Sequence, residues 1–269
     1  MYPLLLEFGP VSIYSYGVIL ATAYIVALQF GLRRADHAGL NGQRVMDLGI
    51  LAIITALVGA KLLLFFVDFD RFTSDPAQLM VLLKSGGVFY GGLLLAVPMS
   101  WWYIRRHKLP LWTTCDLFAP GIALAQGVGR LGCLLAGCCY GKATDLPWGI
   151  TFTSTVAAAN VGTPLEIALH PTQIYEAAAA LLILGALLVG ERHWRPFPGR
   201  TFWTYLLLYG MVRLVIEFYR GDPRGMVFDS VPTSQFLSAL VIPVSLVMLF
   251  LLSQNSQKNY TSPKRRRGV

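Results

Sequence analysis

The sequence predicts an all-α membrane protein with about seven transmembrane helices, its N-terminus outside and its C-terminus in the cytoplasm. Of the 269 residues, 55% are hydrophobic and 13% are charged, and the mean hydropathy is +0.57. A soluble domain has roughly 25% charged residues. The apolar residues also gather in blocks of about 18 or more, the length that crosses a hydrocarbon core of about 30 Å. The composition therefore excludes a soluble enzyme, a disordered chain and a small disulfide scaffold.

The apolar blocks predict a single polytopic membrane domain over residues 1–269. A short interfacial segment is expected at residues 4–13. The N-terminus has no basic region and no small-residue cleavage site, so we expect no cleaved signal peptide. The expected spans follow in chain order, at about 14–32, 48–67, 88–104, 117–135, 172–189, 202–218 and 236–252.

The basic residues predict the orientation of these spans. Fourteen of the 22 Lys and Arg residues lie in the first, third and fifth loops and in the C-terminal tail, whereas five lie in the opposite loops. Because cytoplasmic loops carry the excess of Lys and Arg, the N-terminus is expected outside and the basic tail, about 253–269, in the cytoplasm. The longest loop, about 136–171, then faces outward. The basic clusters form no continuous stripe, so no nucleic-acid partner is predicted.

Charged side chains inside two spans mark a candidate site, because intramembrane charge is costly and is usually functional. Arg130 lies in the glycine-rich segment 127–132, where small residues let a backbone or a lipid headgroup approach closely. Arg213 and Glu217 are one helical turn apart, and Arg220 follows on nearly the same face. These guanidiniums are expected at one depth, where they would bind phosphate in bidentate geometry. The structural alternative is an Arg213–Glu217 ion pair, with Arg130 reaching to the interface.

The predicted outer loop adds a second group of polar candidates. His170 is the only histidine expected on the outer side. A chemical role for His170 competes with a plain position at a helix start, just before a proline at the first helical position. Gln173 and Glu176 fall in the first turns of the same helix, where they either cap it or face the cavity.

Three of the four cysteines lie close together in the sequence, at Cys133, Cys138 and Cys139. Their spacing is not typical of a zinc site, so the sequence predicts no metal, and it predicts no cofactor. Buried small hydrophobic side chains are the default interpretation. A Cys133–Cys138 disulfide in an oxidising compartment and thiol chemistry are the alternatives.

Six segments occur in a specific order along the chain. They are 14–17 (YSYG), 85–92 (SGGVFYGG), 129–132 (GRLG), 144–148 (TDLPW), 170–176 (HPTQIYE) and 209–220. Together they are similar to bacterial prolipoprotein diacylglyceryl transferases over most of the chain. The resemblance implies an enzyme of the bacterial inner (cytoplasmic) membrane that moves diacylglyceryl from phosphatidylglycerol to the lipobox cysteine of a prolipoprotein. Such a reaction forms a thioether and releases glycerol phosphate.

The resemblance also implies roles for individual residues. Arg130 and Arg213 would stabilise the phosphate of the leaving group, with Arg220 as a helper, because positioned guanidiniums lower the barrier where negative charge grows. Glu217 would orient Arg213. The other implied substrate contacts lie in or beside the matched segments, at Tyr16, Gly91, Gly92, Gly129, Gly141 and Tyr209.

Three positions depart from the expected family pattern. Tyr90 stands where the family usually has His, and Cys133 and Cys138 stand where it usually has Asn and Glu. A tyrosine with an ordinary pKa of about 10 is a poor base at neutral pH. Arg-rich surroundings could lower the pKa of Tyr90. Otherwise His170 takes the proton of the acceptor thiol, or that thiol simply loses its proton without a base from the protein.

These departures leave other functions open. One is a paralogue that uses the same phospholipid with another acceptor, or that carries out thiol chemistry at Cys138 and Cys139. Another is a non-catalytic phospholipid-binding membrane protein. A transporter is disfavoured, because the sequence shows no internal repeat and no paired broken helices.

Overall fold

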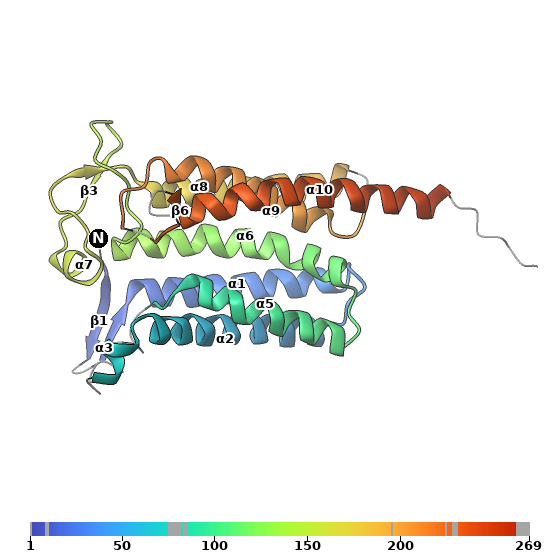
Figure 1. Cartoon of the computed structure of the whole chain (residues 1–269), viewed down its shortest axis with the longest axis horizontal. Coiled ribbons are helices and arrows are strands. Elements are labelled where there is room, and N and C mark those ends of the chain that lie inside the picture. Colours follow the sequence, from blue (N-terminus) through green and yellow to red (C-terminus); the bar gives the residue numbers. More distant parts are fainter. Residues whose placement is uncertain are drawn as a thin grey trace, which may run out of the picture. The chain divides into compact units, whose positions relative to one another are not determined.

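The computed structural model describes residues 2–8, 11–74, 82, 86–194, 196–223, 225–227 and 231–261. Within these ranges the chain is mainly helical, as predicted, and each expected span overlaps one long helix (Figure 1). These helices are α1 (Ser15–Ala35), α2 (Gly42–Val67), α5 (Phe89–Arg106), α6 (Leu111–Ala136), α8 (Thr172–His193), α9 (Arg200–Glu217) and α10 (Thr233–Thr261).

Five helices in the described part of the chain, α1, α2, α6, α8 and α10, are long and apolar enough to cross a membrane. This confirms a multi-pass helical membrane protein. Helix α9 has three charged residues, Arg200, Arg213 and Glu217, among its 18 residues. The count of seven crossings and the orientation of the termini stay predictions.

Short strands add a feature that the all-α prediction does not contain. Strands β1 (Leu4–Phe8) and β2 (Val11–Tyr14) form an antiparallel hairpin where an interfacial segment was expected. Two further antiparallel pairs join β3 (Ile150–Thr151) to β4 (Ala168–Leu169), and β5 (Met226–Val227) to β6 (Val231–Pro232). A short extended segment satisfies its backbone groups by pairing with its neighbour, and period-based prediction does not detect pairs of this length.

The chain divides into two compact units. The first unit contains residues 1–27 and 115–269, and the second contains residues 28–114. In the second unit α2 packs against α5. A Cβ atom on Gly59 would lie 2.3 Å from the carbonyl oxygen of Gly91, and one on Gly91 would lie 2.3 Å from that of Gly59. The two backbones therefore touch at this crossing, which is the close packing that small residues allow in membrane helices. The short helix α3 (Phe69–Ser74) follows α2.

In the first unit, α9 packs against both α8 and α10. The start of α9 is fixed to α6 by Asp116, whose carboxylate accepts hydrogen bonds from the backbone amides of Gly199, at 2.6 Å, and Phe202, at 2.8 Å. Farther along, the Tyr205 hydroxyl donates to the Gln126 side-chain oxygen at 2.8 Å. These polar links set the position of α9 along α6, because each satisfies groups that would be costly to leave unpaired in an apolar bundle.

The segment between α6 and α8, residues 137–171, matches the predicted long loop closely. It contains β3, the helix α7 (Thr155–Val161) and β4, which lie at one end of the α6 and α8 helices (Figure 1). Tyr140, Phe152 and Leu169 form a small buried cluster inside it. The loop is therefore a folded cap on one end of the first unit.

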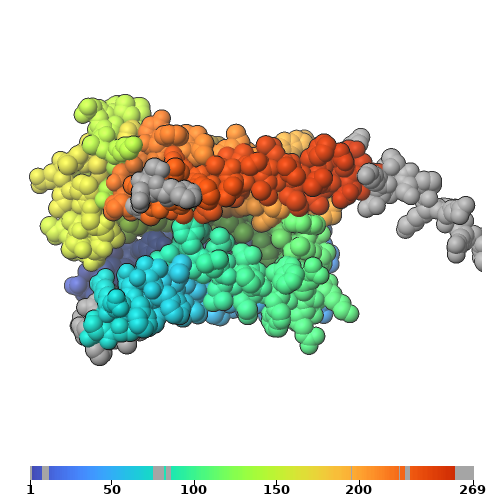
Figure 2. All heavy atoms as spheres, viewed as in Figure 1, coloured from blue at the N-terminus to red at the C-terminus, as the bar shows by residue number. Residues whose placement is uncertain are grey.

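The outer faces of the long helices are apolar and exposed. On α10, which lies at the surface in red in Figure 2, the exposed side chains include Leu240, Val244, Val247 and Phe250. Such a face suits lipid chains and not water. The helix continues to Thr261, into the predicted tail, and residues 262–269 lie outside the described ranges.

The Gly59 contact gives a test of the α2–α5 packing. We expect Gly59→Ala to destabilise the protein by about 1–3 kcal/mol, because an added methyl group in a closely packed contact forces the helices apart. The measurement is thermal unfolding in detergent. Gly185→Ala, on α8 with nothing within 4 Å of the added Cβ atom, is the matched control. Equal unfolding temperatures for the two variants would show that the α2–α5 contact is loose.

Candidate functional site

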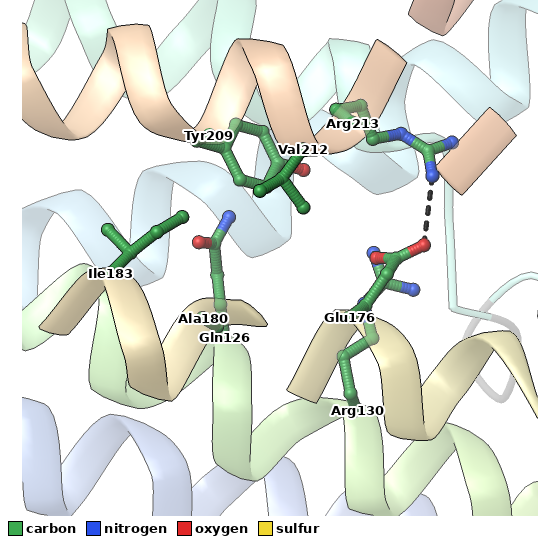
Figure 3. Close-up of a pocket in the computed structure, with 8 residues that line it drawn as sticks. All are labelled: Gln126, Arg130, Glu176, Ala180, Ile183, Tyr209, Val212 and Arg213. Atoms are coloured by element: carbon green, nitrogen blue, oxygen red, sulfur yellow. Dashed lines mark hydrogen bonds and ion pairs between the residues drawn. The ribbon is translucent and has the colours of Figure 1, made fainter. Parts of the chain in front are cut away.

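Three helices bring charged residues together in the first unit. Arg130 is near the end of α6, Glu176 is near the start of α8, and Arg213 is near the end of α9. The Glu176 carboxylate lies 2.6 Å from an Arg130 guanidinium nitrogen and 2.8 Å from one of Arg213. In Figure 3 the Arg213 guanidinium points at the Glu176 carboxylate across the space between α8 and α9.

Arg220, just beyond α9, also binds Glu176 through a guanidinium nitrogen. It makes a second pair with Asp222 through two contacts of 3.0 and 3.1 Å. Arg213 in turn lies 2.6 Å from Glu217. Burial alone would lower the pKa of Arg220, but the neighbouring Cys139, Glu176 and Asp222 raise it, so this guanidinium stays charged.

The resulting charge cluster contains three guanidiniums and three carboxylates, so its formal charges balance. The side chains of Arg213, Arg220, Glu176 and Glu217 are each 7% exposed or less, whereas that of Arg130 is 23% exposed. Arg130 is therefore the guanidinium most open to a ligand. A cavity beside the cluster is lined by Gln126, Arg130, Glu176, Ala180, Ile183, Tyr209, Val212 and Arg213 (Figure 3).

The structure thus brings together five residues that the sequence singled out, Arg130, Arg213, Glu217, Arg220 and Tyr209. Tyr209 lines the cavity and interacts electrostatically with Glu176 and the three arginines.

The shared partner, Glu176, was not among the predicted site residues. The sequence left two positions open for Glu176, a helix cap or a cavity wall. Its ion pairs with three arginines and its place in the cavity lining show that it faces the cavity. A carboxylate within an otherwise apolar helix was the signal that could have identified it.

Tyr16 and Gly129 lie at the side of the site formed by α1 and α6. Tyr16 interacts electrostatically with Cys133, Cys138 and Cys139. A Cβ atom on Gly129 would meet only a Leu20 methyl group, at 4.0 Å. Gly129 therefore leaves space on this face of α6 that is open to a larger group.

His170 and Gly141 belong to the folded cap. The His170 Nδ1 atom lies 3.3 Å from the Tyr175 hydroxyl, and its ring packs edge-on against Tyr219 at 5.2 Å. The Gly141 amide donates to the His170 carbonyl at 3.0 Å, and a Cβ atom on Gly141 would lie 2.4 Å from that of His170. Close backbone packing explains a glycine at this position.

Tyr90, Gly91 and Gly92 belong to the second unit, at the start of α5. Gly91 and Gly92 face α2, where an added Cβ atom would meet the carbonyl oxygens of Gly59 and Ala56 at 2.3 and 2.8 Å. Tyr90 packs edge-on against Phe89 at 5.8 Å. Helix packing accounts for both glycines, and their role toward a substrate stays a prediction.

The three neighbouring cysteines form a thiol cluster, Cys133, Cys138 and Cys139, with sulfur atoms within 4.8 Å of one another. All are free thiols, so the alternative Cys133–Cys138 disulfide is not formed. The pKa of Cys139 lies well below its usual range because it accepts hydrogen bonds from Cys133 and Cys138, with Arg130 and Arg220 adding to the shift. The pKa of Cys138 is raised in turn by its hydrogen bonds to Cys133 and Cys139.

Comparison with known proteins gives the family context of this site. Residues 3–251 match the family described as prolipoprotein diacylglyceryl transferase. A phosphatidylglycerol–prolipoprotein diacylglyceryl transferase of Clostridium tetani is 37% identical, over 91% of this chain and 96% of the relative. A second such enzyme, from Clostridium perfringens, is 31% identical over 96% and 98%. One from Stenotrophomonas maltophilia is 31% identical over 93% and 91%.

The convergence on Glu176 gives a direct test of the charge cluster. We expect Glu176→Gln to lower the stability by about 3–5 kcal/mol, because it leaves buried guanidiniums without their shared counterion. The measurement is the thermal unfolding temperature in detergent. Glu166→Gln, at an exposed position in the folded cap, is the control and should unfold like the unaltered protein. A Glu176→Gln protein as stable as this control would contradict the ion-pair arrangement.

Proposed function

Because the chain belongs to the prolipoprotein diacylglyceryl transferase family, we propose that its three converging guanidiniums bind the phosphate of phosphatidylglycerol. The reaction is the transfer of diacylglyceryl from phosphatidylglycerol to a prolipoprotein, the activity that names its relatives. The observation that carries the proposal is the convergence of Arg130, Arg213 and Arg220 on one carboxylate.

The Glu176 carboxylate explains how such a site is ready for a phosphate. Three guanidiniums in one place repel each other, and a fixed anion between them holds their donors in position. Phosphate oxygens match the planar fork of arginine in the same way as carboxylate oxygens do. Arg130, the most exposed of the three, can offer donors to the lipid, whereas Arg213 and Arg220 stay anchored by Glu217 and Asp222.

The chemical step follows from these contacts. The sulfur of the lipobox cysteine attacks the glyceryl carbon that carries the phosphate, so a C–S bond forms while the C–O bond breaks. The electron pair of the C–O bond leaves with glycerol phosphate, and the thiol proton passes to a base. Negative charge grows on the phosphate during this step, and Arg130 and Arg213, assisted by Arg220, stabilise it.

The remaining site residues take supporting roles in this proposal. Glu217 orients Arg213, to which it is bound. Tyr16 and Tyr209 hydrogen-bond the lipid headgroup. Gly129 provides room on α6, and Gly91, Gly92 and Gly141 contact the substrate as the resemblance implies. The acceptor of the thiol proton is Tyr90 or, in its place, His170.

We further propose seven crossings of the bacterial inner membrane, with the N-terminus outside and the C-terminus in the cytoplasm. The excess of Lys and Arg in alternate loops supports this orientation. It places the folded cap and the charge cluster near the outer surface, on the side where the signal peptide of an exported protein emerges.

Arg213 provides the first test of this function. We expect Arg213→Ala to lower the rate of lipid transfer by about 10²–10³, the usual cost of removing one transition-state donor. Arg213→Lys should also be slow, because the charge stays but the fork is lost. The assay is mass spectrometry of a synthetic lipobox peptide incubated with the protein and phosphatidylglycerol. Arg106→Ala, an exposed arginine at the end of α5, is the control. Full activity of Arg213→Ala would refute its role at the phosphate.

Tyr90 provides a test of proton transfer. We expect Tyr90→Phe to slow transfer by about 10²-fold, at the low end for loss of an acid–base group, while phosphatidylglycerol binding is unchanged. Tyr90→His should keep the activity, because imidazole is the better base near neutral pH. The same peptide assay measures the rate, and lipid binding is followed separately. A Tyr90→Phe protein that transfers lipid at the original rate would leave His170 as the acceptor.

A further inference from the structure

The thiol cluster has no task in the phosphate chemistry described above, although it adjoins it. Its sulfur atoms come from the last turn of α6 and from the two residues after Gly137, and all lie within 4.8 Å of one another. Arg130 and Arg220 both interact electrostatically with Cys139. Three sulfur ligands therefore lie directly beside the charge cluster.

The backbone that carries these thiols is fixed in place. The Gln173 amide nitrogen donates to the Cys138 carbonyl at 2.7 Å, and the Thr172 hydroxyl donates to the Cys139 carbonyl at 2.7 Å. Gln173 and Thr172 are fully buried. Cys139 has a φ of 61°, a left-handed conformation that is uncommon for a residue with a side chain. Strain of this kind is kept where surrounding contacts hold it, and it clusters at functional sites.

The separations fit one metal ion. Zinc–sulfur bonds of about 2.3 Å place the sulfurs of a tetrahedral site about 3.8 Å apart, so small side-chain rotations are sufficient. Three thiolates around a divalent ion leave one net negative charge, and the guanidiniums of Arg130 and Arg220 interact favourably with it at Cys139. The sequence spacing is atypical because the ligands come from a helix end and a left-handed turn, and not from a zinc-finger loop.

We propose that Cys133, Cys138 and Cys139 bind a thiophilic divalent cation such as Zn²⁺, with the fourth position open to the thiol of the acceptor. Three protein ligands and one exchangeable position are the pattern of catalytic zinc sites, whereas structural sites are closed by four. The existence of the site rests on the cysteines alone. The identity of its fourth ligand rests on the proposed function.

The cation would activate the acceptor sulfur. A thiol that coordinates a metal ion gives up its proton, so the nucleophile reaches the site as a thiolate. That proton passes to His170 or to solvent, and neither of these needs to be a strong base. The bound sulfur then forms the C–S bond to the glyceryl carbon, the C–O bond breaks, and the electron pair leaves with glycerol phosphate toward Arg130 and Arg213.

Metal binding by the reduced full chain in detergent tests the site without reference to activity. After chelation and reloading with Zn²⁺ or Co²⁺, we expect one equivalent of metal per chain by elemental analysis and a thiolate-to-cobalt absorption band. Single changes of Cys133, Cys138 or Cys139 to Ser should weaken binding at least about tenfold, since even second-shell changes typically cost that much. Cys115→Ser, which alters the cysteine outside the cluster, should bind like the unaltered chain.

The open position is tested by adding a lipobox peptide to the Co²⁺-loaded chain. The thiolate band should increase with the cysteine peptide and not with its Cys→Ser counterpart. Arg213→Ala should bind metal normally while it loses lipid transfer. The metal site and the proposed transfer function can therefore be contradicted separately. Reduced chain that binds no metal, or that binds it equally when all three cysteines are Ser, would overturn the site. A disulfide within the cluster that persists as the active form would do the same. A thiolate-to-cobalt band that does not change when the cysteine peptide is added would show that the acceptor thiol does not bind at the fourth position.

Discussion

The arrangement of the first unit depends on one buried carboxylate. Glu176 is 6% exposed and pairs with guanidiniums from α6, from α9 and from the segment after α9. A charge moved from water into such surroundings costs several kcal/mol unless it is paired and hydrogen-bonded. Removal of one partner leaves the others as buried charges without a counterion. The end of α6, the start of α8 and the end of α9 must therefore meet at one level. Asp116 and Gln126 hold α9 against α6 farther along the same helix.

In the proposed phosphate site, the same carboxylate would compete with the lipid phosphate. An incoming anion would share donors with Glu176, so it would bind less strongly to a site whose donors are already in position. Because the donors are held before the reaction, little reorganisation is needed when charge develops on the leaving group, which is the main advantage of a preorganised electrostatic site. The exposures agree with this proposal, because the Arg213 and Arg220 side chains are buried in the cluster and the Arg130 side chain is the more exposed one.

The sequence predicted much of this architecture, and its failures have physical reasons. Block hydropathy located the long helices that the described residues form, and intramembrane charge identified Arg130, Arg213 and Arg220 as neighbours. The partner Glu176 could not be assigned, because a polar residue in the first turns of a helix serves equally well as a cap, and only the rotation of α8 against α6 and α9 distinguishes the two. The sequence grouped Cys133, Cys138 and Cys139 but could not show that their three sulfur atoms converge, since that depends on the left-handed backbone of Cys139 and not on spacing.

The proposed metal site offers one explanation for all three departures from the expected family pattern. If the resemblance gives the family pattern correctly, Tyr90 replaces a histidine that could deprotonate a thiol, and Cys133 and Cys138 replace two polar residues with sulfur ligands. The first replacement would leave the nucleophile protonated, and the second would remove polar groups. A cation held by the three cysteines would lower the pKa of the acceptor thiol, so that a protein base is no longer needed. Because Cys139 interacts electrostatically with both Arg130 and Arg220, nucleophile activation and leaving-group stabilisation would then occur side by side.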